Sequence, residues 1–141
     1  MLRSLVGSEM CIRDRLYNWY CVNSAKLCPT GWHLPSDTEW DTLVNYLAIN
    51  GHSGYEGRAL KSTFGWDYNG NGLHDYGWNG LPGGSRHTYG NYFGKGGLGY
   101  WWSNTEKDSG NSWYRGMSSG HGYIRNSIWK TEGFSVRCLK D

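Results

Sequence analysis

The chain has 141 residues, among them 22 glycines, 9 tryptophans and 11 tyrosines, and its formal net charge is +2. This length is enough for one domain with its own core and not for two, and so many aromatic residues exclude a disordered chain. The positive charge is not gathered into a basic run, which argues against a nucleic-acid partner, and no apolar stretch approaches the roughly 20 residues that span a bilayer. We therefore expect an aromatic core surrounded by loops and turns.

Residues 1–15 differ in character from the rest of the chain. They resemble a translated sequencing adaptor of the kind found at the ends of metagenomic proteins, and they have neither the apolar run nor the cleavage site of a signal peptide. We expect residues 1–15 to be a non-native leader that replaced a lost signal sequence, and residues 16–141 to be the domain itself. The alternative is a native leader with little order.

The first part of the domain predicts two extended segments and a helix. Residues 16–20 alternate apolar and polar side chains, which is typical of a strand, and residues 32–34 predict a short extended piece. Ser36 and Glu39 have the spacing of a capping box, and the apolar residues behind them recur at helical intervals. A helix is therefore expected from this point to about Ile49.

The second part predicts a short helix, long loops and an antiparallel sheet. Residues 57–63 fit the helix, with Ala59 and Leu60 facing inward, and residues 65–99 fit structured loops because they hold too many aromatic rings for a flexible linker. Four later segments separated by turns predict an antiparallel meander: 100–103, 112–117, 123–125 and 134–138. The last of them alternates apolar and polar residues, so we expect one of its faces to be buried. The predicted fold class is α+β.

The loop of residues 67–75 has part of the pattern of a calcium site. Oxygen-bearing side chains occupy its positions 1, 3, 5 and 9 and a glycine occupies position 6, but Trp78 stands at position 12, where a calcium loop has a bidentate acid. One interpretation is a calcium site formed by Asp67, Asn69, Asn71 and Asp75. The other, which the missing acid favours, is a plain turn held by Asx hydrogen bonds.

Residues 104–130 have the composition of a binding surface. They are rich in Tyr, Ser, Gly and Asn with a few Trp and Arg, the mixture that antibody combining sites use. We expect Trp101, Trp102 and Trp113 to belong to the core. The predicted ligand-contacting residues are Gly116, Ser118, Ser119, His121, Tyr123, Asn126, Ser127 and Trp129. The sequence predicts no catalytic residues, since it has no nucleophile motif and no histidine pair at metal-ligand spacing.

Eight blocks in order carry a resemblance to a known family. They include Leu-Cys-Pro-Thr-Gly-Trp-His-Leu-Pro at 27–35 and Gly-Phe-Ser-Val-Arg-Cys at 133–138, and the others are 16–20, 39–40, 60–62, 80–84, 100–103 and 113–115. Together they resemble the Fibrobacter succinogenes major paralogous domain of secreted and surface proteins of Bacteroidetes and Fibrobacteres. More distantly, residues 31–40 are similar to a segment of formylglycine-generating enzymes. The resemblance implies a C-type-lectin-like fold in which the N- and C-terminal strands pair.

The cysteines then predict an oxidising compartment. Cys28 and Cys138 lie in two of the family blocks, and a bridge between them would close a loop of about 110 residues, which stabilises by about 4–5 kcal/mol in the chain-entropy model. The alternative is two buried thiols in adjacent elements. Cys11 lies in the leader. Cys21, where the family more often has a small residue, is expected to be an unpaired and partly buried thiol, with a bridge to Cys28 as the alternative.

We expect a secreted or surface-anchored binding module and not an enzyme. Its ligand would be a protein or a glycan, and the domain would belong to a longer secreted or lipid-anchored protein. The residue types of 104–130 also match those that adenine-mutating retroelements generate in some lectin-like proteins. Two alternatives remain: an enzyme of the formylglycine-generating type, disfavoured because only Cys138 lies late in the chain, and a purely structural module. No cofactor other than calcium is indicated.

Overall fold

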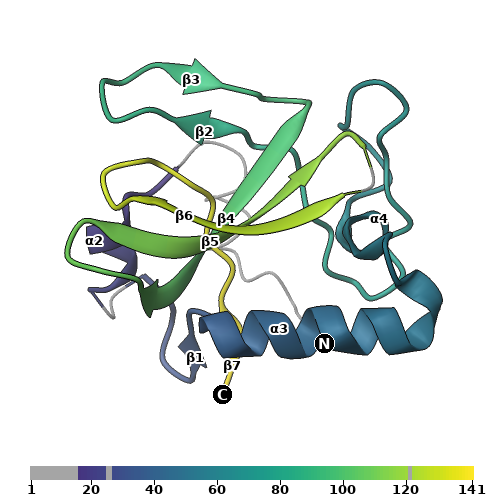
Figure 1. The fold of residues 1–141 in the computed structure, drawn as a ribbon, viewed down its shortest axis with the longest axis horizontal. Coiled ribbons are helices and arrows are strands. Elements are labelled where there is room, and N and C mark those ends of the chain that lie inside the picture. Colours follow the sequence, from purple (N-terminus) through teal and green to yellow (C-terminus); the bar gives the residue numbers. More distant parts are fainter. Residues whose placement is uncertain (1–15, 25–26, 121) are drawn as a thin grey trace.

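The fold is α+β, with few helices and antiparallel strand pairs (Figure 1). The computed structural model describes residues 16–24, 27–120 and 122–141. Its elements in chain order are α2 (Trp19–Val22), β1 (Trp32–His33), α3 (Asp37–Leu47), the turn η1 (Ala48–His52), α4 (Glu56–Leu60), β2 (Ser85–Arg86), β3 (Tyr92–Phe93), β4 (Leu98–Glu106), β5 (Asn111–Ser118), β6 (Tyr123–Trp129) and β7 (Leu139–Lys140). None of the helices in this part of the chain has the length and hydropathy to cross a bilayer.

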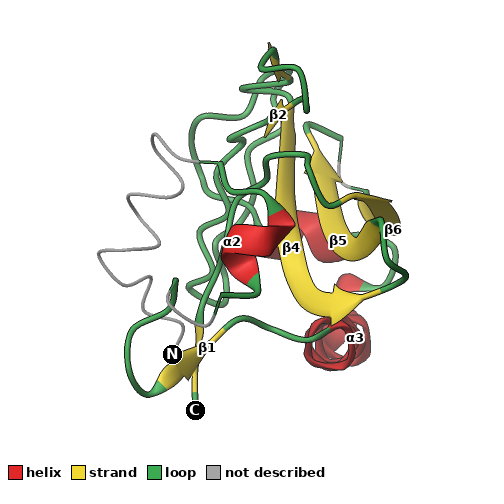
Figure 2. Cartoon of the chain, turned by 90° about the vertical axis from the view of Figure 1, so that its left-hand side faces the viewer, coloured by secondary structure: helices red, strands yellow, loops and turns green. Residues whose placement is uncertain are grey.

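Three strands form the central sheet in the order β4-β5-β6. Both neighbouring pairs are antiparallel, so the predicted meander is confirmed for three of its four segments. Two smaller strand pairs flank this sheet, β2 with β3 and β1 with β7. The second pair lays the C-terminal end of the chain beside β1, as Figure 2 shows.

The main helix, α3, starts where the capping box predicts. The Ser36 N–H donates to Glu39 Oε2 (2.8 Å), and the Glu39 N–H donates to Ser36 Oγ (3.1 Å). Trp40 and Leu47 are buried on its inner face. The helix ends at Leu47, slightly before the expected end, and η1 then passes through Gly51, whose φ of 94° is left-handed and favours glycine. The second predicted helix is confirmed as the short α4.

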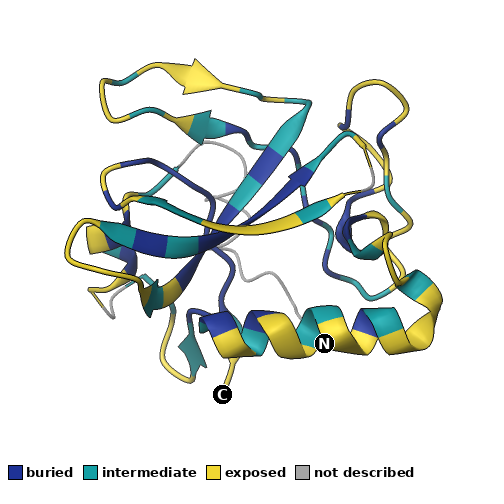
Figure 3. Cartoon of the chain, viewed as in Figure 1, coloured by how far each residue is buried: buried dark blue, intermediate teal, exposed yellow. Residues whose placement is uncertain are grey.

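The sheet lies between two aromatic cores. Figure 3 shows that many positions of its strands are buried. Trp101 and Trp102 are consecutive and both fully buried, and because successive side chains of a strand point to opposite faces, each enters a different core. We call the side facing α3 the helix side; Trp101 packs there on Trp78, with ring centroids 4.8 Å apart. We call the other side the terminal side; Trp102 packs there on Phe134, at 4.6 Å. The predicted aromatic core is thus two cores that share one sheet.

The predicted first strand over residues 16–20 is wrong. Tyr17 makes a single antiparallel bridge with Phe134, and the chain then turns into α2. The reason is Asn18, whose side chain accepts a hydrogen bond from the Cys21 N–H (3.0 Å) and so caps a helical turn. Trp19 is buried, and it enters the core from this helix.

The prediction of a last strand over residues 134–138 is also wrong. Its residues form isolated bridges and not a ladder, and all five are buried, so the expected exposed face does not exist. The segment runs inside the molecule, where the Ser135 N–H donates to the Tyr100 carbonyl (2.9 Å) and the Ser135 carbonyl accepts from the Trp102 N–H (3.1 Å). The Arg137 guanidinium donates to the Trp78 carbonyl and lies over the Trp78 ring. Backbone groups thus accept from the Arg137 guanidinium and pair with the Ser135 backbone, whereas the Ser135 hydroxyl is buried without a hydrogen-bond partner among the described residues.

The predicted Cys28–Cys138 disulfide is confirmed. It joins cysteines 110 positions apart, with Cα atoms 5.8 Å from each other. Cys21 is free and partly buried, as expected. The bridge therefore closes nearly the whole domain covalently at the end where β1 and β7 pair.

Candidate binding face

The predicted ligand-contacting residues lie on or between β5 and β6, which present alternate residues to the two sides of the sheet. The opposite pairs on the helix side are Asn111 with Trp129, Trp113 with Ser127, Arg115 with Arg125 and Met117 with Tyr123. The pairs on the terminal side are Ser112 with Ile128, Tyr114 with Asn126 and Gly116 with Ile124. The eight predicted residues therefore do not share one surface.

Two of these residues are less accessible than expected. Gly116 is buried under its neighbours, because a Cβ built there would lie 2.8 Å from Ile124 Cγ1 and 3.0 Å from Tyr100 Cδ1. Tyr123 is half-buried with its hydroxyl oxygen enclosed, and burial raises the pKa of that phenol to about 12. Neither Gly116 nor the Tyr123 hydroxyl is therefore accessible to a ligand at the predicted binding surface.

The remaining predicted residues stay accessible at two ends of the hairpin. Ser118 and Ser119 are partly exposed at the β5–β6 turn, Asn126 is exposed and Ser127 partly exposed on β6, and Trp129 is 57 % exposed at the end of β6. His121 lies outside the described residues. The accessible predicted residues therefore form two groups, one at the β5–β6 turn and one along the second half of β6.

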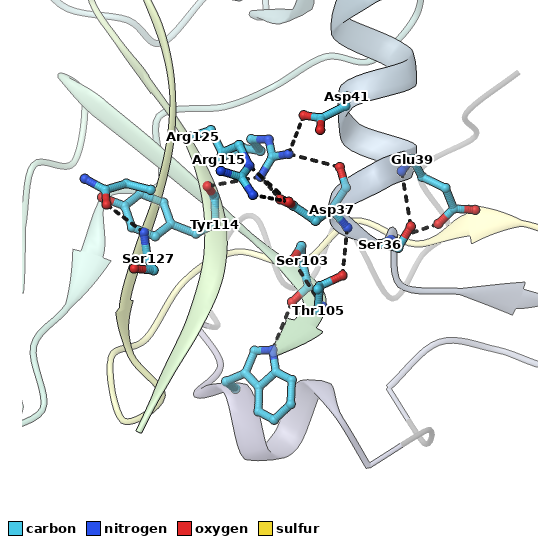
Figure 4. A network of polar contacts seen from close by, with 12 residues as sticks. Ser36, Asp37, Glu39, Asp41, Ser103, Thr105, Tyr114, Arg115, Arg125 and Ser127 are labelled. Carbon is cyan, nitrogen blue, oxygen red and sulfur yellow. Dashed lines mark hydrogen bonds and ion pairs between the residues drawn. The ribbon is translucent and has the colours of Figure 1, made fainter. Parts of the chain in front are cut away.

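Two arginines are clamped onto the start of α3 (Figure 4). Arg115, which is fully buried, donates to Asp37 Oδ1, to the Asp37 carbonyl (3.0 Å) and to Asp41 Oδ1 (2.8 Å). Arg125 donates to Asp37 Oδ2 from Nε (3.0 Å) and Nη2 (2.5 Å). The Asp37 N–H in turn donates to Thr105 Oγ1 (2.9 Å), which ties the same residue to β4.

Asp37 resolves an electrostatic conflict in the sheet. Arg115 and Arg125 stand directly opposite each other, and like charges in that position repel. Burial alone would raise the pKa of Asp37, but the hydrogen bonds from Arg125 and Arg115 outweigh it and hold that pKa below its ordinary value. The carboxylate therefore stays charged between the two guanidinium groups and fixes the hairpin against α3.

The clamp also positions an aromatic and cationic surface, which we call the Trp113 patch (Lys107, Trp113, Arg125, Ser127 and Trp129). The Arg125 guanidinium lies 3.7 Å from the centroid of the Trp113 ring, and Lys107 Nζ lies 5.3 Å from it. Lys107 Nζ also donates to Ser127 Oγ (2.9 Å). The prediction that Trp113 belongs to the core is wrong, since it is half-buried and lies in neither core cluster.

Sequence reasoning missed the charged members of this patch. Selection by composition favoured small polar and aromatic residues and passed over Lys107 and Arg125. The available signal was alternation: counting back from Trp129 by twos places Ser127 and Arg125 on one face, and the hairpin register adds Trp113.

Residues 67–75 are the loop for which a calcium site is one of the two interpretations. The side-chain oxygens of this loop contact different partners. Asn71 Oδ1 accepts the Trp66 N–H (3.0 Å), and Asp75 Oδ2 lies 3.9 Å from His52 Nε2. Asn69 is left-handed with φ of 58°, as an Asn/Gly turn allows. Within the described ranges, no three His, Cys, Asp or Glu side chains are grouped as a metal site requires. Calcium binding stays a prediction.

Fold and surface together define an α+β domain, closed by a disulfide, that carries an aromatic and cationic patch on a fixed hairpin. The comparison with family models assigns the chain to one protein family. The chain belongs to the Fibrobacter succinogenes major domain family, whose model matches residues 7–140. The comparison with curated proteins found no match.

Proposed function

We propose that this domain is an extracellular or cell-surface binding module of C-type-lectin-like fold, which contacts a protein or glycan ligand through the Trp113 patch. The observation that carries the proposal is the exposed Trp129 on the same face of the hairpin as a Trp113 ring that already lies under a cation. Exposed aromatic rings supply contact area at a low cost in side-chain entropy, and they suit both sugars and peptides.

Preorganisation of the patch supports the same role. Arg125 is held by Asp37 and Ser127 by Lys107, so these side chains need little further ordering when a ligand arrives. Ordering side chains is one of the main costs of association, so a patch that is already ordered binds better per unit area. The Cys28–Cys138 bridge supports an oxidising, extracellular setting.

The enzymatic alternative has weaker support. Formylglycine-generating enzymes use a pair of reactive cysteines late in the chain, whereas the late Cys138 is bonded to Cys28. A purely structural module is the stronger rival, because the disulfide and the two cores would serve it equally well.

A binding experiment separates these functions. The domain is screened on a glycan array and in a pulldown from surface-protein extracts, as wild type and as Trp129→Ala. Tyr46→Ala is the matched control, since Tyr46 is an aromatic residue of similar exposure (53 %) on α3. We expect at least tenfold weaker binding for Trp129→Ala and none of that loss for the control. Equal binding by all three proteins would contradict the patch, and no binding by any of them would favour the structural module.

A further inference from the structure

A buried lysine reaches from the end of α4 into the β5–β6 turn. Lys61 is fully buried, and its Nζ donates to three consecutive backbone carbonyls, those of Ser118 (2.9 Å), Ser119 (3.4 Å) and Gly120 (2.7 Å). The same nitrogen lies 4.8 Å from the centroid of the Trp66 ring. An ammonium group has three N–H donors, so the three carbonyls match its full hydrogen-bonding capacity.

The turn is packed on its other sides as well. The Ser119 N–H donates to the Gly97 carbonyl (2.8 Å). Gly70 comes so close that a Cβ there would lie 2.4 Å from the Ser119 carbonyl oxygen, which only a glycine allows. Three carbonyl dipoles point at one site between these contacts, and Lys61 supplies the positive charge that they require.

We propose that Lys61 is a positioning residue whose positive charge holds the β5–β6 turn in place, and with it Ser118 and Ser119 at one end of the binding hairpin. The conformational part of this inference stands by itself, and only its consequence for a ligand rests on the proposed function. If the ammonium loses a proton, it keeps two donors and turns a lone pair toward a carbonyl oxygen. The third hydrogen bond is then replaced by repulsion, and the turn loosens.

The surroundings of Lys61 make that loss accessible. Burial, with a contribution from the charge of Arg58, lowers the pKa of Lys61 to about 8. Arg58 is the charged residue that lowers this pKa, and Lys61 Nζ itself contacts the Trp66 ring and the three carbonyls. Unlike the Asp37 carboxylate, the Lys61 ammonium has no counter-ion among the residues that the structure describes.

Amide hydrogen exchange measured by NMR tests the proposal without any ligand. The reporter is the Ser119 amide, and the Trp102 amide, which donates to the Ser135 carbonyl, is the internal reference. At pH 7 we expect Lys61→Met, which keeps the side chain's bulk, to lower the protection factor of Ser119 at least tenfold and to leave Trp102 unchanged. Lys130→Met is the matched control, because Lys130 is also buried but binds Glu106 and the Ser109 carbonyl.

The main result of a second measurement comes from the wild-type protein, and Lys61→Met serves as its comparison. After correction for intrinsic exchange, the protection of Ser119 should fall as pH rises through about 8, and Lys61→Met should lack this step. Ser119 protection that is unchanged in Lys61→Met, or a wild-type profile with no step, would overturn the proposal. Neither measurement involves binding. The proposed role of Lys61 can therefore be wrong while the binding function is right, and the reverse is also true.

Discussion

On its terminal side the central sheet packs on Phe134 and its aromatic neighbours and is closed by the Cys28–Cys138 bridge, whereas on its helix side it is held by Arg115 and Arg125 on Asp37. Ring contacts and a covalent bond do not change with pH. Buried ion pairs contribute only while both partners are present and charged. The two sides should therefore respond to different treatments: the terminal side to reduction, and the helix side to charge substitution.

The largest expected effect is on the terminal side. Cys28→Ala/Cys138→Ala should lower the free energy of unfolding by about 4–5 kcal/mol, because the unfolded chain regains the freedom that a long closed loop removes. Urea denaturation measures the loss, and dithiothreitol should reproduce it in the wild type and have no effect on the double variant. Amide protection should fall first at Tyr17 and Phe134, which pair near the bridge. Earlier loss of amide protection along α3 would contradict the idea that reduction acts first on the terminal side.

Substitution of Arg115 should break the helix side. Arg115→Met should cost about 3–5 kcal/mol, since it leaves the buried Asp37 carboxylate with one partner fewer. Arg125→Met removes the more exposed partner of the same carboxylate and should cost only about 1 kcal/mol. Urea midpoints of the two variants give the contrast directly, and equal losses would mean that burial of the guanidinium does not set its contribution.

The smallest expected effect is at the junction of the two sides, where His33 links β1 to α3. Its ring nitrogens lie 2.6 Å from Asp141 Oδ1 and 2.7 Å from Glu39 Oε1, and these hydrogen bonds raise the pKa of His33 above its ordinary value. A raised pKa means that the folded state binds the proton more tightly, so the stabilisation is complete below pH 6.5 and is lost as pH rises through the folded-state value.

The exposure of these side chains keeps that stabilisation under about 1 kcal/mol. The check is a set of urea midpoints for wild type and His33→Gln at several values between pH 6 and pH 9. The difference between the two proteins should shrink with rising pH, and a difference that stays constant would exclude a charged His33.

Local signals explain which parts of the fold could be predicted. The Ser36–Glu39 box and the helical spacing of Trp40 and Leu47 are complete within one element, and α3 is where they place it. Residues 134–138 have an equally regular alternation, but their surroundings decide the outcome: Ser135 is enclosed because it bonds the backbone of β4. Alternation shows that a segment is extended and does not show whether a second layer covers its polar face.

The residues of the Trp113 patch could not be predicted either, because their exposure also depends on what packs over them. The composition of residues 104–130 does not distinguish a core tryptophan from a surface one, and the position of Trp113 opposite Ser127 puts it on an outer part of the helix side. The Asp37 clamp joins residues 78 and 88 positions apart, and Lys61 reaches a turn 57 to 59 positions away. Contacts at such separations depend on the tertiary fold, and one sequence does not contain them as a local pattern.

The Cys28–Cys138 bridge also has a mechanical consequence. If tension is applied to the chain on either side of the domain, it passes from Cys28 to Cys138 through the sulfur–sulfur bond, because a covalent link is far stiffer than the folded segment that it bypasses. The residues between these two cysteines, which are 110 positions apart, then bear no load. The hairpin that carries the Trp113 patch lies within that unloaded segment, so tension carried along the chain would leave the shape of the patch unchanged.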